Sequence, residues 1–245
     1  MNNQFERSEL IYGTDAMFRL KQTHIAIFGV GGVGGYVAES LARSGVGHFT
    51  LVDNDVVSLS NFNRQIIATH DTIGKLKVDV MKERILSINP EAIVDTYNLF
   101  FLEENADEFE FYNFDYVVDC VDTVKAKIAL AKLADKNKVP IISCMGAGNK
   151  VNPMGFVVTD IFKTEMDPLA KAMRSELRKA GVRRLKVVFS YERPIKPVAH
   201  LLDEQSKKRE IPGSNAFVPP AAGLLIASEV VRDLTNEVAR DVLRR

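Results

Sequence analysis

The glycine-rich run at residues 29–34, GVGGVG, constrains the fold more than any other feature of the sequence. The apolar residues 25–28 precede it and apolar residues at helical spacing follow it, so the pattern predicts a strand, a tight turn and a helix. Gly29 permits the turn, Gly31 lets a ligand phosphate approach the backbone, and Gly34 lets the helix pack closely on the strand. Because the amides at a helix start attract anions, this stretch predicts a phosphate-binding site.

An acidic residue follows the second predicted strand, residues 48–52. Asp53 stands at the distance from the glycines at which nucleotide-binding folds place the carboxylate that holds the ribose. The strand, turn, helix and acid together predict a nucleotide-binding domain. NAD is the usual nucleotide for this pattern, so an NAD-dependent oxidoreductase is one candidate function.

Composition narrows the class of protein. Of 245 residues, 46% are hydrophobic and 26% charged, which is typical of a soluble globular protein. Lys plus Arg equals Asp plus Glu, at 32 each, so no global field draws the chain to nucleic acid or membrane, although a local patch remains open. The two cysteines form no C-x-x-C pair, which excludes a disulfide framework and a cysteine-built zinc site. The sequence shows no signal peptide and no membrane-spanning stretch, so we expect a cytoplasmic protein.

Strands and helices alternate along the first 150 residues, which predicts an α/β fold with a doubly wound, Rossmann-like, mostly parallel sheet. The rhythm then changes, and two strands around a helix predict an antiparallel C-terminal extension. We therefore expect one domain, 1–245, with a nucleotide-binding core at 1–150 and an extension at 151–245. The expected strands are 93–99, 114–120, 139–145, 156–162 and 185–191, and the expected helices are 74–89, 103–112, 124–136, 167–180 and 219–234.

A polar loop, residues 54–65, follows the second strand and offers little apolar surface for burial. Ligands bind at such loops where parallel strands end. Lys75 and Lys77 fall in the first turn of the next predicted helix, where an anionic ligand would compensate for their unfavourable interaction with the helix dipole, although Lys75 fits a solvated surface lysine better. Asp122 ends a later strand and fits equally a helix N-cap and a carboxylate that holds Mg²⁺ against phosphates.

Basic residues cluster in the C-terminal third. Three of them share one face of the helix predicted at 167–180, and three more lie in a loop predicted at 192–218. Such charges fit a solvated surface, and beside a nucleotide pocket they also fit a patch that binds RNA phosphates. The four histidines show no metal-site spacing, so we treat them as structural. The candidate RNA contacts are Lys171, Arg174, Arg178, Lys207, Lys208 and Arg209.

The glycine turn is one of five elements with a specific spacing, the others being Asp53-x-Asp55-x-Val57, Ser60-Asn61-x-x-Arg64-Gln65, Lys77 and Asp119-Cys120-x-Asp122. Together they resemble the ubiquitin-activating-enzyme-like superfamily of ATP-dependent adenylating enzymes, the group of MoeB, ThiF and HesA. The resemblance covers about residues 7–148 and implies a fold that binds ATP, not NAD. In this superfamily a substrate carboxylate attacks the α-phosphorus of ATP, and cations must cancel the repulsion between the two anions.

The resemblance implies a role for each matching residue. Arg7 resembles the N-terminal arginine that reaches across a dimer interface to the partner's ATP, so a homodimer is expected. Asp122 would hold Mg²⁺ and Asp53 the ribose, while Gln65 would support the loop. The implied catalytic residues are Arg7, Arg64, Lys77 and Asp122, and the implied ATP-binding residues are Gly29, Gly31, Gly32, Gly34, Asp53, Asp55, Asn61, Arg64, Gln65 and Lys77.

The C-terminal third resembles the tRNA threonylcarbamoyladenosine dehydratase branch of this superfamily, through VTDI-x-KT-x-x-DPL at 158–169, Leu177-Arg178 and VVFS at 187–190. In that branch ATP adenylates the threonyl carboxylate of the modified adenosine, the carbamoyl group of the substrate closes a ring onto it, and AMP leaves. No enzyme nucleophile is needed, which agrees with the absence of any cysteine after Cys144. We interpret Cys120 and Cys144 as small buried strand residues, with a redox role left open.

Several alternatives and partners remain open at this point. An adenylyltransferase that activates the C-terminus of a ubiquitin-like sulfur-carrier protein shares the core, but the missing C-x-x-C pairs argue against it. An oxidoreductase leaves Asn61, Arg64, Lys77 and Asp122 without a role, and a non-catalytic scaffold has no need of them. The resemblance implies a tRNA substrate and an extension that faces it and supports dimerisation, with sulfur-transfer or cysteine desulfurase proteins as further candidate partners. A monovalent cation at the loop after Gly146 is also left open, and no zinc is expected.

Overall fold

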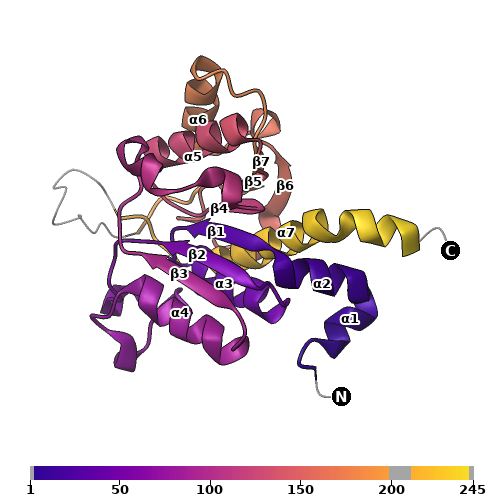
Figure 1. Cartoon of the computed structure of the whole chain (residues 1–245). Coiled ribbons are helices and arrows are strands. Elements are labelled where there is room, and N and C mark those ends of the chain that lie inside the picture. The colour runs from indigo at the N-terminus through magenta and orange to yellow at the C-terminus, as the bar shows by residue number, and fades with distance from the viewer. Residues whose placement is uncertain (1–2, 199–210, 243–245) are drawn as a thin grey trace.

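The computed structural model describes residues 3–198 and 211–242, with side chains up to residue 235. Its centre is one seven-stranded sheet in the order β3-β2-β1-β4-β5-β7-β6 (Figure 1). All neighbouring strands run parallel except β6, which pairs antiparallel with β7. The strands are β1 (His24–Phe28), β2 (His48–Val52), β3 (Ile93–Tyr97), β4 (Tyr116–Asp119), β5 (Ile141–Cys144), β6 (Phe156–Asp160) and β7 (Lys186–Ser190).

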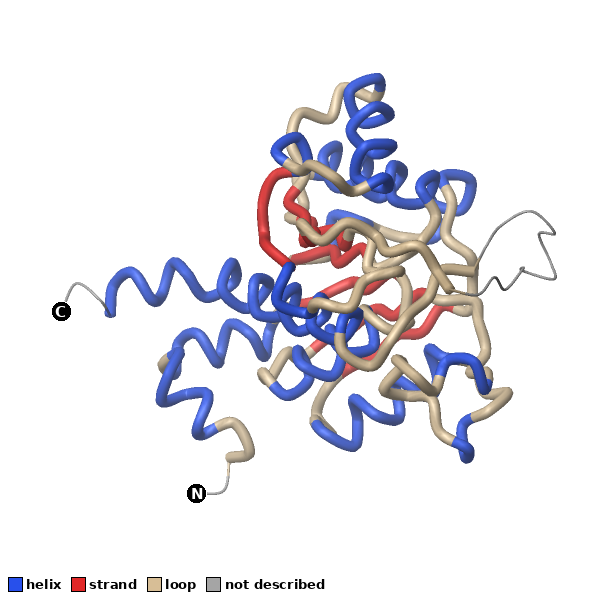
Figure 2. The backbone as a smooth tube through the Cα atoms, turned by 180° about the vertical axis from the view of Figure 1, so that it is seen from behind, coloured by secondary structure: helices blue, strands red, loops and turns tan. Residues whose placement is uncertain are grey.

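Helices cover both faces of the sheet, as Figures 1 and 2 show from opposite sides. One layer holds α2, α3, α4 and α7, and the other holds α5 and α6. The doubly wound, mostly parallel architecture predicted from the sequence is therefore confirmed, with the difference that β7 runs parallel to β5 and only the edge strand β6 is antiparallel. The helices are α1 (Glu6–Tyr12), α2 (Thr14–Gln22), α3 (Gly34–Arg43), α4 (Lys77–Ile88), α5 (Val124–Asn137), α6 (Pro168–Lys179) and α7 (Val218–Val242).

The central strands are apolar on both faces because a helical or loop layer buries each face. In β1, Ile25 and Ile27 join the core under α3 and α7, whereas Ala26 and Phe28 join a second core on the opposite face. That second core is built largely of aromatic rings from the segment between β3 and β4.

The prediction of a helix at 103–112 is wrong, because this segment forms two short 3₁₀ turns, Glu103–Glu108 and Phe111–Asn113. Phe109 and Phe111 both turn toward Phe28 of the sheet. Residues two apart point to different sides of an α-helix, so a helix would carry one of these rings away from the core. Burying both rings therefore favours the irregular path.

Three helix boundaries differ from the sequence prediction for local reasons. The N-terminal lead-in is two helices, separated at Gly13 with φ of 83°. The helix predicted from Gly74 begins at Lys77, because Gly74 has φ of 81° and Leu76 pairs with Val56 in an isolated β-bridge. Lys75 therefore precedes the helix, and the dipole argument applies to Lys77 alone. The final helix extends beyond the predicted 219–234. Within the described residues, no helix has the length and apolar character needed to span a bilayer.

Candidate functional site

The glycine turn lies where β1 and β4 end side by side, at what we call the carboxyl edge of the sheet. Gly29 adopts φ of 89°, and a Cβ there would lie 2.8 Å from the carbonyl carbon and oxygen of Cys120. A Cβ on Gly34 would lie 1.8 Å from the carbonyl oxygen of Gly29. Both positions therefore require glycine for backbone packing, as predicted. In doubly wound folds ligands bind at the carboxyl edge, where the direction of winding reverses between two such strands.

Open space remains next to the middle of the turn. Among the described residues, the only atom that a Cβ on Gly31 would meet within 4 Å is the side-chain Nε2 of Gln65, at 3.9 Å. Val33, the N-cap of α3, makes no side-chain capping hydrogen bond. An uncapped helix start beside open space is a site that an anion can complete.

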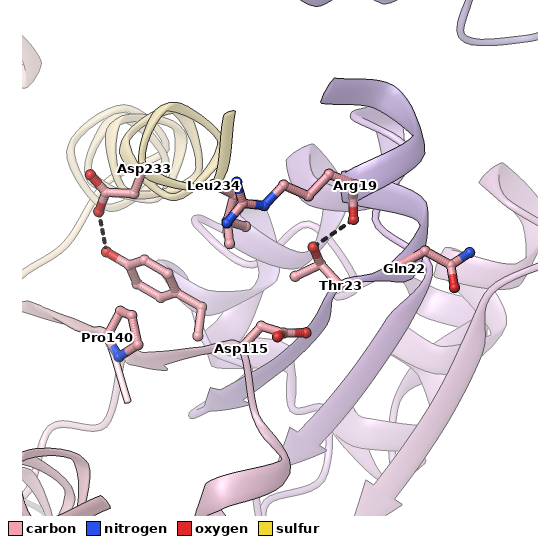
Figure 3. A pocket seen from close by; sticks show the side chains of 8 residues that line it. Arg19, Gln22, Thr23, Asp115, Pro140, Asp233 and Leu234 are labelled. Carbon is pink, nitrogen blue, oxygen red and sulfur yellow. Dashed lines mark hydrogen bonds between the residues drawn. The ribbon is translucent and has the colours of Figure 1, made fainter. Parts of the chain in front are cut away.

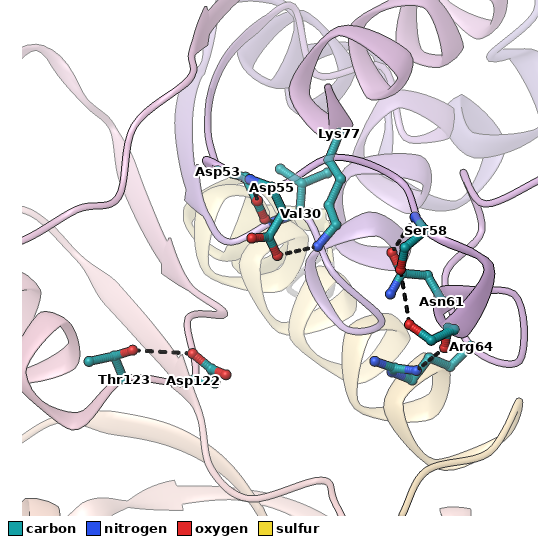
Figure 4. Close-up of polar contacts among 10 residues, drawn as sticks. Val30, Asp53, Asp55, Ser58, Asn61, Arg64, Lys77, Asp122 and Thr123 are labelled. Carbon is teal, nitrogen blue, oxygen red and sulfur yellow. Dashed lines mark hydrogen bonds and ion pairs between the residues drawn. The ribbon is translucent and has the colours of Figure 1, made fainter. Parts of the chain in front are cut away.

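Two carboxylates and a buried lysine stand beside this turn (Figure 4). Asp53 accepts hydrogen bonds from the amides of Val30, at 2.7 Å, and Asp55, at 2.9 Å. Burial raises the pKa of Asp53, an effect that Lys77 and these two amides oppose. Lys77 is 4% exposed and its Nζ lies 2.6 Å from Oδ2 of Asp55. The turn is thereby held by Asp53, and a cation is fixed next to it.

The polar loop forms the opposite wall of the site. The side-chain oxygen of Asn61 accepts from the amide of Ser58 at 3.1 Å, and Arg64 donates to the carbonyl of Ser60 at 2.9 Å. Burial lowers the pKa of the half-buried Arg64. Gln65 is 7% exposed, and its Oε1 is buried without a hydrogen-bond partner in the part of the chain that the structure describes. A buried acceptor without a partner beside Gly31 indicates that a ligand or water completes this site.

Asp122 lies across the site from Arg64 and Lys77 (Figure 4). The N-cap interpretation of Asp122 is wrong, because Thr123 is the N-cap of α5. The Asp122 side chain is exposed and accepts a 3.2 Å hydrogen bond from the hydroxyl of Thr123. A hard cation prefers such carboxylate oxygens, so the residue type fits Mg²⁺, and that role stays a prediction.

Two buried ion pairs near this edge were missed by sequence reasoning. Lys127 of α5 lies 3.0 Å from Oδ2 of Asp119, with side chains 1% and 0% exposed, and also donates to Ser143 at 3.3 Å. Lys150 lies 3.3 Å from Oδ2 of Asp167 and 2.7 Å from the carbonyl oxygen of Gly146. The sequence signal that could have identified Lys127 as buried is its position among the alanines of α5. Asp167 was predicted only as the N-cap of α6, which it is, since it accepts from the amide of Ala170 at 2.8 Å.

The segment 211–218 and helix α7 close the site from a distant part of the sequence. A Cβ on Gly223 of α7 would lie 2.5 Å from the carbonyl oxygen of Val33, so the helix touches the glycine turn. Asn63 of the polar loop donates to the carbonyl of Ser214 at 3.0 Å. Asn215 donates to the carbonyl of Lys150 at 2.8 Å. The C-terminal extension is therefore part of the wall around the candidate site.

The basic face of α6 is partly engaged in contacts of its own. Arg174 donates to the hydroxyl of Thr164, and the guanidinium of Arg178 lies 5.2 Å from the ring centre of Phe162. Lys171 is exposed. Their role as RNA contacts stays a prediction, and Lys207, Lys208 and Arg209 lie outside the described residues.

Arg7 does not join the site within one chain. It is an exposed residue of α1, and Phe5, just before α1, packs on Gly45 in the turn that leads into β2. This turn lies at the amino edge, where the parallel strands begin. The amino edge also holds a cavity of about 250 Å³ between α2 and α7, where Tyr116 donates to Asp233 at 2.6 Å (Figure 3). Neither feature lies beside the glycine turn.

The two cysteines fit the structural interpretation. Cys144 is buried in β5, and burial raises the pKa of its thiol to about 12. Burial also raises the pKa of Cys120 well above its usual value. Both thiols are therefore protonated at neutral pH, which makes them poor nucleophiles.

Two of the four histidines, which show no metal-site spacing in the sequence, contact each other in the fold. The rings of His24 and His48 stack at a centroid distance of 3.5 Å with planes 3° apart. His48 also lies 2.7 Å from Asp95. Sequence spacing does not show this cluster, because the pairing register of three parallel strands brings it together.

The comparisons with known proteins agree with this architecture. The ThiF family model matches residues 3–243. A tRNA threonylcarbamoyladenosine dehydratase of Bacillus subtilis is 45% identical over 246 residues, which cover 97% of each chain. A crystal structure of Escherichia coli tRNA N6-threonylcarbamoyladenosine dehydratase with ATP superposes with a TM-score of 0.86 at 33% identity, and one with AMP superposes with 0.87 at 34%. Both structural comparisons cover 97% of this chain and 96% of the other.

Proposed function

The chain belongs to the ThiF family, and from that premise we propose that it catalyses the ATP-dependent dehydration of threonylcarbamoyladenosine in tRNA. The observation that carries the proposal is the pair of cations, Lys77 and Arg64, next to an open and uncapped helix start. The similarity to dehydratases runs along almost the whole of both chains, so it includes the C-terminal extension as well as the core. The threonyl carboxylate attacks the α-phosphorus of ATP, which forms the acyl adenylate and releases pyrophosphate. The carbamoyl group of the substrate then attacks the acyl carbon, and AMP leaves as the ring closes.

The residues of the site match the charges of this reaction. The amides of the glycine turn and the start of α3 bind the phosphates, and Asp53 accepts from the ribose hydroxyls. Lys77 and Arg64 neutralise the phosphates that the incoming carboxylate must approach. Asn61 holds the loop that carries Arg64 by accepting from the amide of Ser58, and the buried Gln65 is proposed to support the same loop. Mg²⁺ held by Asp122 would supply further positive charge against the phosphates.

The extension at 151–245 is proposed to face the tRNA and to support dimerisation. Its helix α6 presents Lys171 and Arg178 at the surface, and such cations bind RNA phosphates. Since its substrates are tRNA and ATP, we place the reaction in the cytoplasm. Sulfur-transfer or cysteine desulfurase proteins are proposed as further partners on the resemblance alone.

We also propose that the protein acts as a homodimer in which Arg7 completes the partner's site. Within one chain Arg7 lies at the amino edge, opposite the glycine turn, so it can reach a site only in trans. Helix α1, which carries Arg7, and the next helix α2 expose apolar side chains, with Leu10 at 87%, Ile11 at 79% and Phe18 at 67% exposure. Exposed apolar patches of this kind mark interaction surfaces.

Mass spectrometry of nucleosides tests the reaction. Threonylcarbamoyladenosine-containing tRNA is incubated with the protein and Mg-ATP, and we expect the nucleoside to lose one water while AMP forms. Lys77→Ala should lower the rate by about 10²–10³-fold, as removal of a charge-stabilising donor does. Lys75→Ala is the matched control, because Lys75 is exposed two residues away and should keep full activity.

An unchanged nucleoside would contradict the dehydratase proposal. In that case ATP–pyrophosphate exchange stimulated by a small ubiquitin-like protein would identify the chain as an adenylyltransferase for protein C-termini. Absence of both activities would remove the adenylation proposal itself.

Complementation tests the dimer. Arg7→Ala and Arg64→Ala are each expected to be inactive, but mixed dimers contain one site with both arginines intact. Random mixing should restore about a quarter of the unaltered activity, because half of the dimers are mixed and one site in each is complete. Failure of the mixture to regain activity, with subunit exchange verified by mass, would contradict the action of Arg7 in trans.

A further inference from the structure

Three polar side chains meet at the amino edge, on the face of the sheet that carries the aromatic core. His24 of β1 and His48 of β2 are register partners, and Asp95 of β3 is the register partner of Thr50, two residues beyond His48. Because alternate residues of a strand share a face, all four side chains lie on the same face of three adjacent strands. One ligand atom from each of His24, His48 and Asp95 lies within 4.8 Å of the others.

Each imidazole ring has its Nε2 atom beside a side-chain oxygen on the adjacent strand. Nε2 of His24 lies 2.9 Å from the hydroxyl of Thr50, and Nε2 of His48 lies 2.7 Å from Oδ2 of Asp95. The parallel stack of the rings, 3.5 Å between centroids, keeps the nitrogens adjacent. The carboxylate and the two rings thus lie together beside Thr50, and because the lone pairs of parallel rings point in parallel directions, one ring must tilt for both to reach the same ion.

The dimensions of this cluster suit a transition metal. Zinc binds imidazole nitrogens and carboxylate oxygens at about 2.0–2.2 Å in a tetrahedron, so its ligand atoms lie about 3.3–3.6 Å apart. The ligand atoms of the cluster lie within 4.8 Å of one another, so the widest pair must approach by up to about 1.5 Å, whereas Nε2 of His48 and Oδ2 of Asp95, 2.7 Å apart, must separate by about 0.6–0.9 Å. The side chains of His48 and Asp95 are 28% and 51% exposed, so they can rotate into that arrangement without displacing a packed core.

We propose that His24, His48 and Asp95 form a binding site for a divalent transition metal of the zinc type. The ion takes the Nε2 lone pairs of both histidines and one carboxylate oxygen of Asp95, and a water fills the fourth position, which faces solvent. Nε2 of each histidine must be unprotonated, so the remaining ring proton resides on Nδ1. Two imidazoles and a carboxylate are a ligand set that zinc accepts.

The bound metal joins β1, β2 and β3 where these strands begin. A five-residue strand spans about 13 Å, so the ion lies at the far end of the strands from the glycine turn. We therefore assign it a stabilising role that is independent of ATP binding.

Metal titration of the full chain without any histidine tag tests this site. After treatment with chelator and desalting, Co²⁺ is added as a spectroscopic probe and Zn²⁺ binding is measured by calorimetry. We expect one ion per chain, visible ligand-field bands of four-coordinate Co²⁺, and a melting temperature higher by about 5 °C at a hundredfold excess over Kd. ATP affinity should not change.

Three variants decide the outcome. His48→Gln and Asp95→Asn should each weaken binding at least tenfold and remove the rise in melting temperature, with unchanged melting in the absence of metal. The control is His70→Gln, since His70 is exposed and lies elsewhere, packed 4.9 Å from the ring of Phe62. Binding that is equal in all variants, or that is lost in His70→Gln, would overturn the proposal, as would the absence of any saturable binding to the unaltered chain.

Discussion

Charged side chains are buried to different degrees at the two edges of the sheet. At the carboxyl edge three lysines are buried: the pairs Lys127–Asp119 and Lys150–Asp167 expose no side chain by more than 1%, and the side chain of Lys77 is 5% exposed. At the amino edge the pair Lys21–Glu91 has side chains 59% and 75% exposed, and Lys186, which pairs with Glu229 and Asp233, has a side chain 34% exposed. Burial of a charge costs free energy of folding unless a partner compensates, but it strengthens the action of that charge on a ligand. The buried charges at the carboxyl edge therefore act more strongly on a bound ligand than the exposed charges at the amino edge.

The largest difference between the edges is expected for the ion pairs themselves. Lys127→Met leaves Asp119 buried without a cation and should lower the free energy of unfolding by about 3–5 kcal/mol. Lys21→Met, at the amino edge, should lower it by less than about 1 kcal/mol, because water already screens that pair. Urea denaturation measures both. Equal losses for the two variants would show that burial does not distinguish the edges.

Substitutions of two glycines should have equal effects at the two edges, since each edge has a glycine whose Cβ would overlap a backbone carbonyl oxygen. A Cβ on Gly34 would lie 1.8 Å from the carbonyl oxygen of Gly29, and a Cβ on Gly47 would lie 1.8 Å from that of Lys21. Gly34→Ala and Gly47→Ala should each lower the free energy of unfolding by about 3 kcal/mol, at the upper end for overpacking. Thermal unfolding provides the measurement. If either variant melts like the unaltered protein, its contact does not constrain the fold.

A substitution at Gly31 should weaken ligand binding at the carboxyl edge while changing the stability of the fold only slightly. The space around it is open, so Gly31→Ala should change the free energy of unfolding by less than about 1 kcal/mol. The added methyl group lies where phosphates approach, and we expect ATP affinity to fall by at least about tenfold, or 1.4 kcal/mol. Calorimetry with ATP reads this directly. Unchanged affinity would place the phosphates elsewhere.

The smallest effect is expected for the thiols, which lie at the same edge as the lysines. A Cys120→Ala and Cys144→Ala double variant should keep dehydratase activity within about twofold, because both thiols have raised pKa values and are protonated at neutral pH. A loss of activity in a protein that melts normally would assign a chemical role to one of them. Each single variant would then identify which.

The sequence predicted the parts of the molecule that depend on local pattern. The glycine turn and the order of strands along the chain follow from period and residue type, and so does the N-cap at Asp167. The partners of Lys127 and the meeting of His24 with His48 were missed because they depend on the order and register of strands, which a single sequence does not show. The path of residues 103–113 was mispredicted because ring burial overrode an acidic, helix-like composition.

The contact between α7 and the glycine turn also bears on how the protein forms during synthesis. Val33 leaves the ribosome long before Gly223, which packs against it, is made. A nascent chain can form β1 and α3 before then, but the wall that covers them is missing. The nucleotide site is therefore completed late in translation, and until that moment the nascent chain exposes the apolar face of α3 that α7 will cover.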